Sequence, residues 1–170
     1  MTKVTSDYPP EIARQKLTSL FNDSLSMIAC ISDMCDSQAT VFAALCDGKN
    51  VTNAGNHIEA DYEVTKLAAI INVLENHFYL PISRQKINTE ADTGATALQA
   101  RYMISAEDLS ELIENPELVI SRREKQAFLR LIRRDERCLK RLINMHGYDE
   151  VFKSLSSLQP ANDPLERNCG

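Results

Sequence analysis

The side chains whose types and spacing point most clearly to a chemical role are basic. Residues 122–141 hold nine Lys and Arg and three Asp and Glu, whereas residues 1–121 hold eight basic and 17 acidic residues. The whole chain has a net charge of −5, so this segment is a basic island in an acidic protein. Such a segment is typical of a surface that meets an anionic partner. The overall acidity argues against a protein that coats nucleic acid over its whole surface.

The basic residues of this segment recur at helical spacing and share one arc of a helix at 100° per residue. We assign six of them as candidate DNA-binding residues and call them the basic stripe: Arg130, Arg133, Arg134, Arg137, Lys140 and Arg141. Arg123 lies in the same arc, and apolar residues such as Phe128, Leu131 and Leu139 lie opposite. From residue 123 to 141 the arc is about 27 Å long, enough to follow several phosphates of a duplex strand. Two other interpretations of the basic residues stay open. They form a solvated face, free or paired with the acidic residues at 107–114, or they form a binding site for an acidic protein.

The remaining reactive side chains form no catalytic or metal-binding motif. His57, His77 and His146 are isolated, the five cysteines have no C-x-x-C spacing, and there is no P-loop, dinucleotide-binding glycine motif or G-x-S-x-G. We therefore expect no enzyme activity, no cofactor and no metal. Four cysteines in apolar segments are expected to pack as small hydrophobic side chains: Cys30, Cys35, Cys46 and Cys138.

Hydropathy places the chain outside the membrane. The first residues lead into no apolar stretch of the kind that a signal peptide needs. No apolar run approaches the roughly 18–20 residues of a membrane span. We expect a cytoplasmic protein.

The first half of the chain reads as helices. Apolar residues recur at helical spacing from Pro10 to about Ser32 and predict one long N-terminal helix. A second helix is predicted from residue 36 or 37 to Cys46, with Asp47-Gly48 as its end. A short helix is predicted to begin at Val51-Thr52, and a third, strongly amphipathic helix runs from residue 63 to 77.

The period of the pattern changes after Pro81. Residues 82–88 and 98–104 predict two strands of a hairpin, with Leu98, Ala100, Tyr102 and Ile104 facing the helices. A further helix is predicted over 105–115, with Ser105 and Asp108 as a capping box. Asn115-Pro116 is predicted to restart the chain, as a cap followed by Pro at the first helical position. Ser121 and Glu124 are predicted to form a second capping box for a helix that runs to about Met145, and a last helix is predicted over 149–158. Residues 159–170 are predicted to be disordered.

These elements predict a mainly α fold. Residues 1–36 form an N-terminal helix, residues 37–104 a winged helix-turn-helix core with one two-stranded hairpin, residues 105–158 a C-terminal helical extension and residues 159–170 a tail. The core also resembles the small winged helix-turn-helix domain common in phage and prophage proteins. The segments that carry the resemblance are Val41-Phe42-Ala43-Ala44-Leu45-Cys46-Asp47-Gly48, Val51-Thr52, residues 65–74, Leu80-Pro81-Ile82 and residues 100–104.

The resemblance implies that the third helix is a recognition helix and that the hairpin is a wing. The corresponding candidate DNA-binding residues are Thr65, Lys66, Asn72 and Asn76 on the helix, and Arg84, Lys86 and Arg101 on the hairpin, which we expect at the solvent side. The sequence departs from the family pattern because the helix carries Glu63 and Glu75 and the loop between the strands carries Glu90 and Asp92. Carboxylates at these places would repel phosphate.

Two functions follow from this sequence, and both remain open. The first is a DNA-binding protein, a phage or prophage transcriptional regulator that contacts duplex DNA with the third helix, the hairpin and the basic stripe. The second is a phage-type interaction protein that uses the same scaffold to bind a host transcription or replication protein. The N-terminal and C-terminal helices carry more apolar surface than a core of this size covers, so they either pack on each other or pair between two chains. We favour a homodimer.

Overall fold

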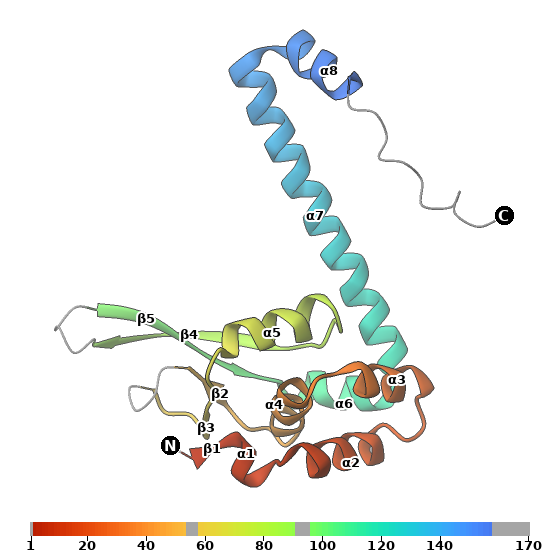
Figure 1. Cartoon of the computed structure of the whole chain (residues 1–170), viewed down its shortest axis with the longest axis vertical. Helices are drawn as coiled ribbons and strands as arrows, with labels where there is room; N and C mark the ends of the chain where they lie inside the picture. The colour runs from red at the N-terminus through yellow and green to blue at the C-terminus, as the bar shows by residue number, and fades with distance from the viewer. Residues whose placement is uncertain (1, 54–57, 91–95, 158–170) are drawn as a thin grey trace, which may run out of the picture. The chain divides into compact units, whose positions relative to one another are not determined.

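The protein is mainly helical and has one small sheet (Figure 1). The computed structural model describes residues 2–53, 58–90 and 96–157. The chain divides into two compact units, residues 1–127 and residues 128–170. Helix α7 runs from the first unit into the second, and each unit is described by itself.

The N-terminal region consists of three helices: α1 (Val4–Asp7), α2 (Pro10–Leu20) and α3 (Leu25–Asp33). The prediction of one long helix over 10–32 is therefore wrong. The side chain of Ser24 accepts a hydrogen bond from the Met27 amide at 3.2 Å and so caps a new helix. The turn between the helices also directs Phe21 inward, where its ring stacks on that of Phe42 at 6.0 Å between centroids.

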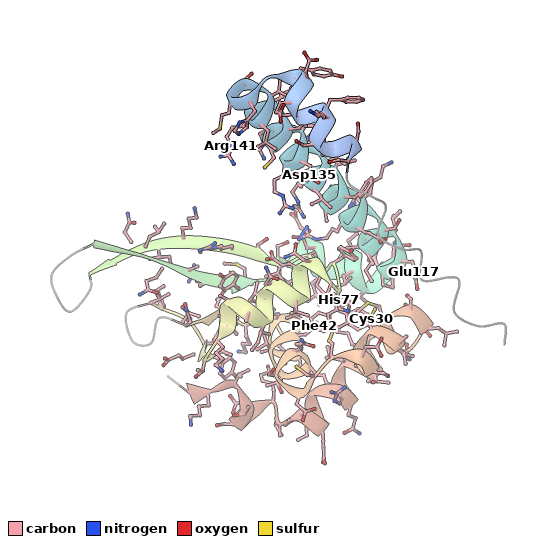
Figure 2. All side chains as sticks on the ribbon, turned by 45° about the horizontal axis from the view of Figure 1, so that its top comes forward. Cys30, Phe42, His77, Glu117, Asp135 and Arg141 are labelled. Atoms are coloured by element: carbon pink, nitrogen blue, oxygen red, sulfur yellow. The ribbon has the colours of Figure 1, made fainter. Side chains whose placement is uncertain are left out.

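Helix α4 (Asp36–Cys46), which confirms the predicted second helix, is the centre of the first unit. Every residue from Ala39 to Cys46 is buried, and Phe42 is among the largest fully buried side chains (Figure 2). Helices α1, α2 and α5 all contact α4. Small Ala side chains at positions 39, 43 and 44 suit close packing on several sides.

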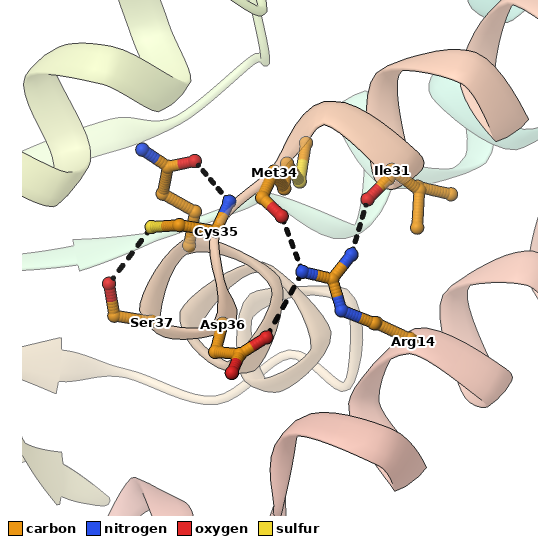
Figure 3. A network of polar contacts seen from close by, with 7 residues as sticks. Arg14, Ile31, Met34, Cys35, Asp36 and Ser37 are labelled. Atoms are coloured by element: carbon orange, nitrogen blue, oxygen red, sulfur yellow. Dashed lines mark hydrogen bonds and ion pairs between the residues drawn. The ribbon is translucent and has the colours of Figure 1, made fainter.

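Arg14 on α2 fixes the junction between α3 and α4. Its guanidinium donates to the carbonyl of Ile31 at 2.9 Å, to the carbonyl of Met34, and to Asp36 at 3.1 Å (Figure 3). These bonds satisfy carbonyls that the end of α3 leaves without a helical partner. Cys35 at the same junction is exposed, with its sulfur 3.2 Å from the Ser37 hydroxyl.

The burial expected of four cysteines is found at one of them. Cys46 is buried, Cys30 is half-buried, and Cys35 and Cys138 are exposed. Apolar neighbours in the sequence do not decide burial, because Cys35 lies at a helix start and Cys138 on an uncovered helix.

The sheet has the strand order β1-β3-β2-β5-β4. Strands β1 (Thr2–Lys3), β2 (Val51–Thr52) and β3 (Tyr62–Glu63) have two residues each and pair in parallel. The helix predicted to begin at Val51-Thr52 is thus wrong at that point, since these residues are a strand paired with β5. The Thr52 hydroxyl donates to the Ala100 carbonyl at 3.0 Å rather than capping a helix.

Helix α5 (Leu67–Asn76) is shorter than the helix predicted over 63–77. Glu63 belongs to β3, and the Val64 amide donates to the Thr52 carbonyl at 2.8 Å, so the chain is still extended there. Lys66 then adopts a left-handed conformation with φ 58° and starts the helix.

Strands β4 (Ser83–Glu90) and β5 (Thr96–Met103) confirm the predicted hairpin. Ala100, Tyr102 and Ile104 are buried as expected. Leu98 is 60% exposed, against expectation, because the hairpin extends beyond the helices toward its tip (Figure 1). The loop at 91–95, with Asp92, lies outside the described residues.

The C-terminal helices are α6 (Ala106–Glu114), α7 (Pro116–His146) and α8 (Tyr148–Ser156). The Ser105 cap is confirmed, since its hydroxyl accepts from the Asp108 amide at 3.1 Å. The second capping box is wrong: Ser121 lies inside α7, which begins at Pro116. Gly147, with φ 81°, separates α7 from α8. The tail predicted to be disordered lies outside the described residues.

Candidate nucleic-acid interface

The basic stripe lies on the second half of α7, and all six of its side chains are exposed. Arg130 and Arg141 mark its ends, about 17 Å apart at 1.5 Å per residue. Because the helix is continuous through this region, the six cations keep a fixed spacing along one arc. Figure 2 labels Arg141 on this part of the helix.

Few carboxylates compete for these cations. Among the described residues, the one ion pair of the stripe joins Arg134 to its neighbour Asp135 at 3.5 Å, with both side chains more than 60% exposed. Arg137 donates to the carbonyl of Arg133 at 3.1 Å, which leaves its terminal nitrogens free to contact a ligand. Residues 128–157 hold seven basic and four acidic residues, so the described part of this unit is positive.

The two arginines that precede the stripe have structural partners. Arg122 makes a two-pronged contact with Glu111 on α6, at 2.7 and 2.5 Å. This hydrogen-bonded pair raises the pKa of Arg122 and lowers the pKa of Glu111. Arg123 donates to the carbonyl of Leu80 at 3.2 Å. Pairing with the acidic segment 107–114, one of the interpretations left open by the sequence, is therefore found at Arg122, and the basic stripe begins beyond these two arginines at Arg130.

Of the candidates on the predicted third helix, Asn72 and Asn76 lie on α5, and Thr65 and Lys66 directly precede it. Thr65, Lys66, Asn72 and Asn76 are all exposed. Lys66 stands before the helix rather than in its first turn, and the Asn76 side-chain amide donates to the Asn72 carbonyl at 3.0 Å. The Asn76 amide must break this hydrogen bond before it can contact a base, so Asn76 is less suited to base recognition.

The hairpin candidates are divided between two faces of the sheet. Arg84 pairs across the strands with Tyr102, and Lys86 pairs with Ala100, so these two cations share the face of the buried residues. They remain exposed because β4 is the outer strand of the described sheet. The Arg84 guanidinium lies 5.8 Å from the centre of the Tyr102 ring.

Arg101 lies on the opposite face of the hairpin and is half-buried. Its guanidinium donates to the Gln85 side chain at 2.8 Å and to the Glu59 carbonyl at 3.2 Å. Arg84 and Lys86 are exposed as expected, although they lie on the face of the buried residues, and Arg101, on the other face, is partly covered by its two partners. A shift of one residue along a strand moves a side chain to the other face.

An exposed apolar surface lies on α7 and α8; the sequence indicated excess apolar surface on the C-terminal helices without showing which of their residues stay uncovered. Its side chains are 39–68% exposed. We call it the α7–α8 apolar face: Phe128, Leu129, Leu131, Ile132, Leu139, Leu142, Met145, Tyr148, Phe152 and Leu155. The helical spacing of Tyr148, Phe152 and Leu155 beyond Gly147 is the signal that could have revealed its extension into α8.

The described part of the chain holds neither a metal-binding cluster nor a membrane-spanning helix. No group of three or more His, Cys, Asp or Glu side chains there is placed to hold a metal ion. Within the same residues no helix has the length and apolar character needed to cross a membrane. Comparison with family models, with curated proteins and with solved structures found no match.

Proposed function

We propose that the chain is a DNA-binding protein that grips the duplex backbone with the basic stripe. In this proposal it acts in the cytoplasm as a transcriptional regulator of the phage or prophage type, as the resemblance of residues 37–104 implies. The winged-helix assignment is part of the proposal. The hairpin cations Arg84 and Lys86 and the α5 residues are secondary contacts.

One observation carries the proposal: six exposed cations occupy one arc of a continuous helix in a chain that is otherwise acidic. Five of the six are Arg, whose planar guanidinium forms two parallel hydrogen bonds with a phosphate. Contacts of this kind position a protein on DNA without reading its sequence. The proposed stripe therefore supplies affinity, and any sequence preference has to come from α5 and the hairpin.

The test is the salt dependence of binding to a labelled duplex, measured by fluorescence anisotropy. If all six cations neutralise phosphates, the slope of log K against log salt is about −5. The double variant Arg133→Glu with Arg137→Glu should flatten this slope by about 2 and weaken binding to unrelated sequences alike. Both side chains are exposed, so circular dichroism should show an unchanged fold.

A matched control carries the same change of charge away from the stripe. Lys125→Glu with Lys153→Glu alters two exposed lysines outside the arc and should leave the slope within about one unit of the wild-type value. If both double variants lose affinity equally, net charge alone governs binding, and the assignment of the stripe is wrong.

The alternative function is an interaction protein, and the charge of the first unit favours it. Residues 1–127 hold 11 basic and 18 acidic residues, and Glu63 and Glu75 lie in or beside α5. The negative charge of this unit disfavours contact with DNA. It is compatible with a role of α5 in binding another protein. Unchanged DNA affinity in Arg133→Glu with Arg137→Glu, together with loss of a co-purifying host protein from nuclease-treated lysate, would favour this alternative.

A further inference from the structure

The second unit has no core of its own. Among its described residues, 128–157, Val151 is the one side chain classed as buried, at 9% exposed. The larger residues around it form the α7–α8 apolar face defined above. By contrast, α2 and α3 bury Leu17, Met27 and Ile31 in the core of the first unit and leave Ile12 and Leu25 exposed, so most of the excess apolar surface expected from the sequence lies in α7 and α8.

The size of this face matches that of a protein interface. Ten large apolar residues at 39–68% exposure leave on the order of 900 Å² uncovered, if each has about 150–200 Å² when fully exposed. Stable complexes bury about 800 Å² on each partner. The largest apolar patch on a typical monomer is about 300–600 Å². The face is therefore large enough to hold a second protein chain.

The spacing on α7 is that of paired helices. The residues that follow the middle of the face are separated by alternating steps of four and three: Phe128, Ile132, Asp135, Leu139, Leu142 and His146. This alternation is typical of helices that pack side by side along a seam. The basic stripe lies on the opposite arc, so two copies can join through this face without bringing their stripes together.

Asp135 determines the direction of pairing. In a parallel pair in register, each residue along the line of contact faces the same residue of the partner subunit. Two Asp135 carboxylates would then meet and repel each other. In an antiparallel pair whose two-fold axis passes next to residue 137, Asp135 lies opposite Leu139 of the partner subunit. In the same register, Ile132 lies opposite Leu142 of the partner subunit.

We propose that the α7–α8 apolar face binds a second copy of this chain in this antiparallel arrangement. A hollow of about 350 Å³ between α7 and α8 supports the register. It is lined by Leu142, His146, Val151 and Leu155, among others. The antiparallel pairing brings Phe128 of the partner subunit to the level of His146, where its ring fills this hollow. The proposal does not depend on DNA binding.

The first test is the mass of the full chain in solution, measured by size exclusion with light scattering. The expected result is a particle of twice 19.1 kDa. Leu139→Asp with Leu142→Asp places carboxylates in the seam and should give a monomer whose first unit is still folded, as judged by its thermal unfolding. Arg133→Glu with Arg137→Glu should remain a dimer, so a failure of DNA binding and a failure of dimerisation are distinguishable.

The second test uses the wild-type chain and a short bismaleimide crosslinker. In the antiparallel register, Cys138 flanks the seam next to the axis and lies close to Cys138 of the partner subunit. A parallel pair would put the two thiols on opposite flanks of the seam. Crosslinked dimer is therefore expected from the wild type and from Cys35→Ser, and it should disappear in Cys138→Ser.

Three results would overturn the proposal. A wild-type monomer at high micromolar concentration would show that a second copy does not cover the face. A dimer that survives Leu139→Asp with Leu142→Asp would place the contact elsewhere. A dimer without crosslinking through Cys138 would contradict the antiparallel arrangement.

Discussion

Lys66 offers a way to separate a structural effect from a binding effect at one position. Its backbone has φ 58° and ψ 25°, the left-handed region, directly before α5. Its side chain is exposed and is a candidate contact to DNA. Lys66→Ala and Lys66→Gly remove the same side chain, and they differ in whether the residue is strained in this conformation.

The magnitude follows from the backbone. A residue with a Cβ loses about 1–2 kcal/mol in the left-handed region, whereas glycine adopts it without that cost. Glycine also gains freedom in the unfolded chain, which offsets about 0.4–1 kcal/mol. We therefore expect Lys66→Gly to be more stable than Lys66→Ala by about 0.5–1 kcal/mol.

Urea unfolding followed by circular dichroism measures this difference. With a denaturant dependence of about 2 kcal/mol per molar urea, the midpoint of Lys66→Gly should lie roughly 0.3–0.5 M above that of Lys66→Ala. In the anisotropy assay the two variants should lose the same DNA affinity, because both lack the ammonium group. A glycine variant that is no more stable than the alanine variant would refute the assignment of strain at Lys66.

Three further predictions concern the first unit. Leu112 on α6 is fully buried. Leu112→Ala should therefore lower the free energy of unfolding, measured by urea titration, by about 2–5 kcal/mol. A loss below about 1 kcal/mol would mean that α6 is not packed on the core. Ser24 caps α3 and also donates to Glu117 at 2.6 Å, so Ser24→Ala should cost about 1 kcal/mol in the same assay, and an unchanged midpoint would contradict the cap. Burial acts to raise the pKa of Asp47, but hydrogen bonds from Lys16 and Tyr8, each 2.6 Å, outweigh it and hold the pKa below its ordinary value of 3.8. A carboxylate whose pKa is lower in the folded protein stabilises the fold at a pH above its unfolded-state pKa, and this stabilisation is lost as the pH falls through the folded-state pKa. The free energy of unfolding of the wild type should therefore drop more steeply than that of Asp47→Asn below about pH 4. Parallel curves of stability against pH would refute this linkage.

Local signals predicted many of the element boundaries. Pro10 begins α2 and Pro116 begins α7 because each lacks the amide hydrogen that the first turn leaves unpaired. Ser105 caps α6 because its hydroxyl reaches the Asp108 amide within one turn. The alternating pattern at 98–104 predicted a strand, and its buried residues Ala100 and Tyr102 follow that pattern. Each of these signals acts over only a few residues.

The errors arise where a distant partner competes with a local signal. Thr52 has the chemistry of a helix cap, but its hydroxyl donates to Ala100, 48 residues away. Ser121 also resembles a cap, yet α7 had already begun at Pro116. For the candidate site, charge and helical spacing located the basic stripe, but the sequence could not pair Arg122 with Glu111 or Arg101 with Gln85.

The sequence by itself determined that the protein is mainly helical, that one hairpin interrupts the helices, and that the basic residues share one arc of a long helix. These properties follow from residue periodicity and from capping side chains, which act within a few turns. Tertiary structure decided which apolar residues are covered: Leu17 on α2 and Ile31 on α3 are buried in the core, while the apolar arc of α7 beyond residue 127 stays exposed. Periodicity shows that a helix has an apolar side, and burial of that side depends on surfaces that come from elsewhere in the chain or from another molecule.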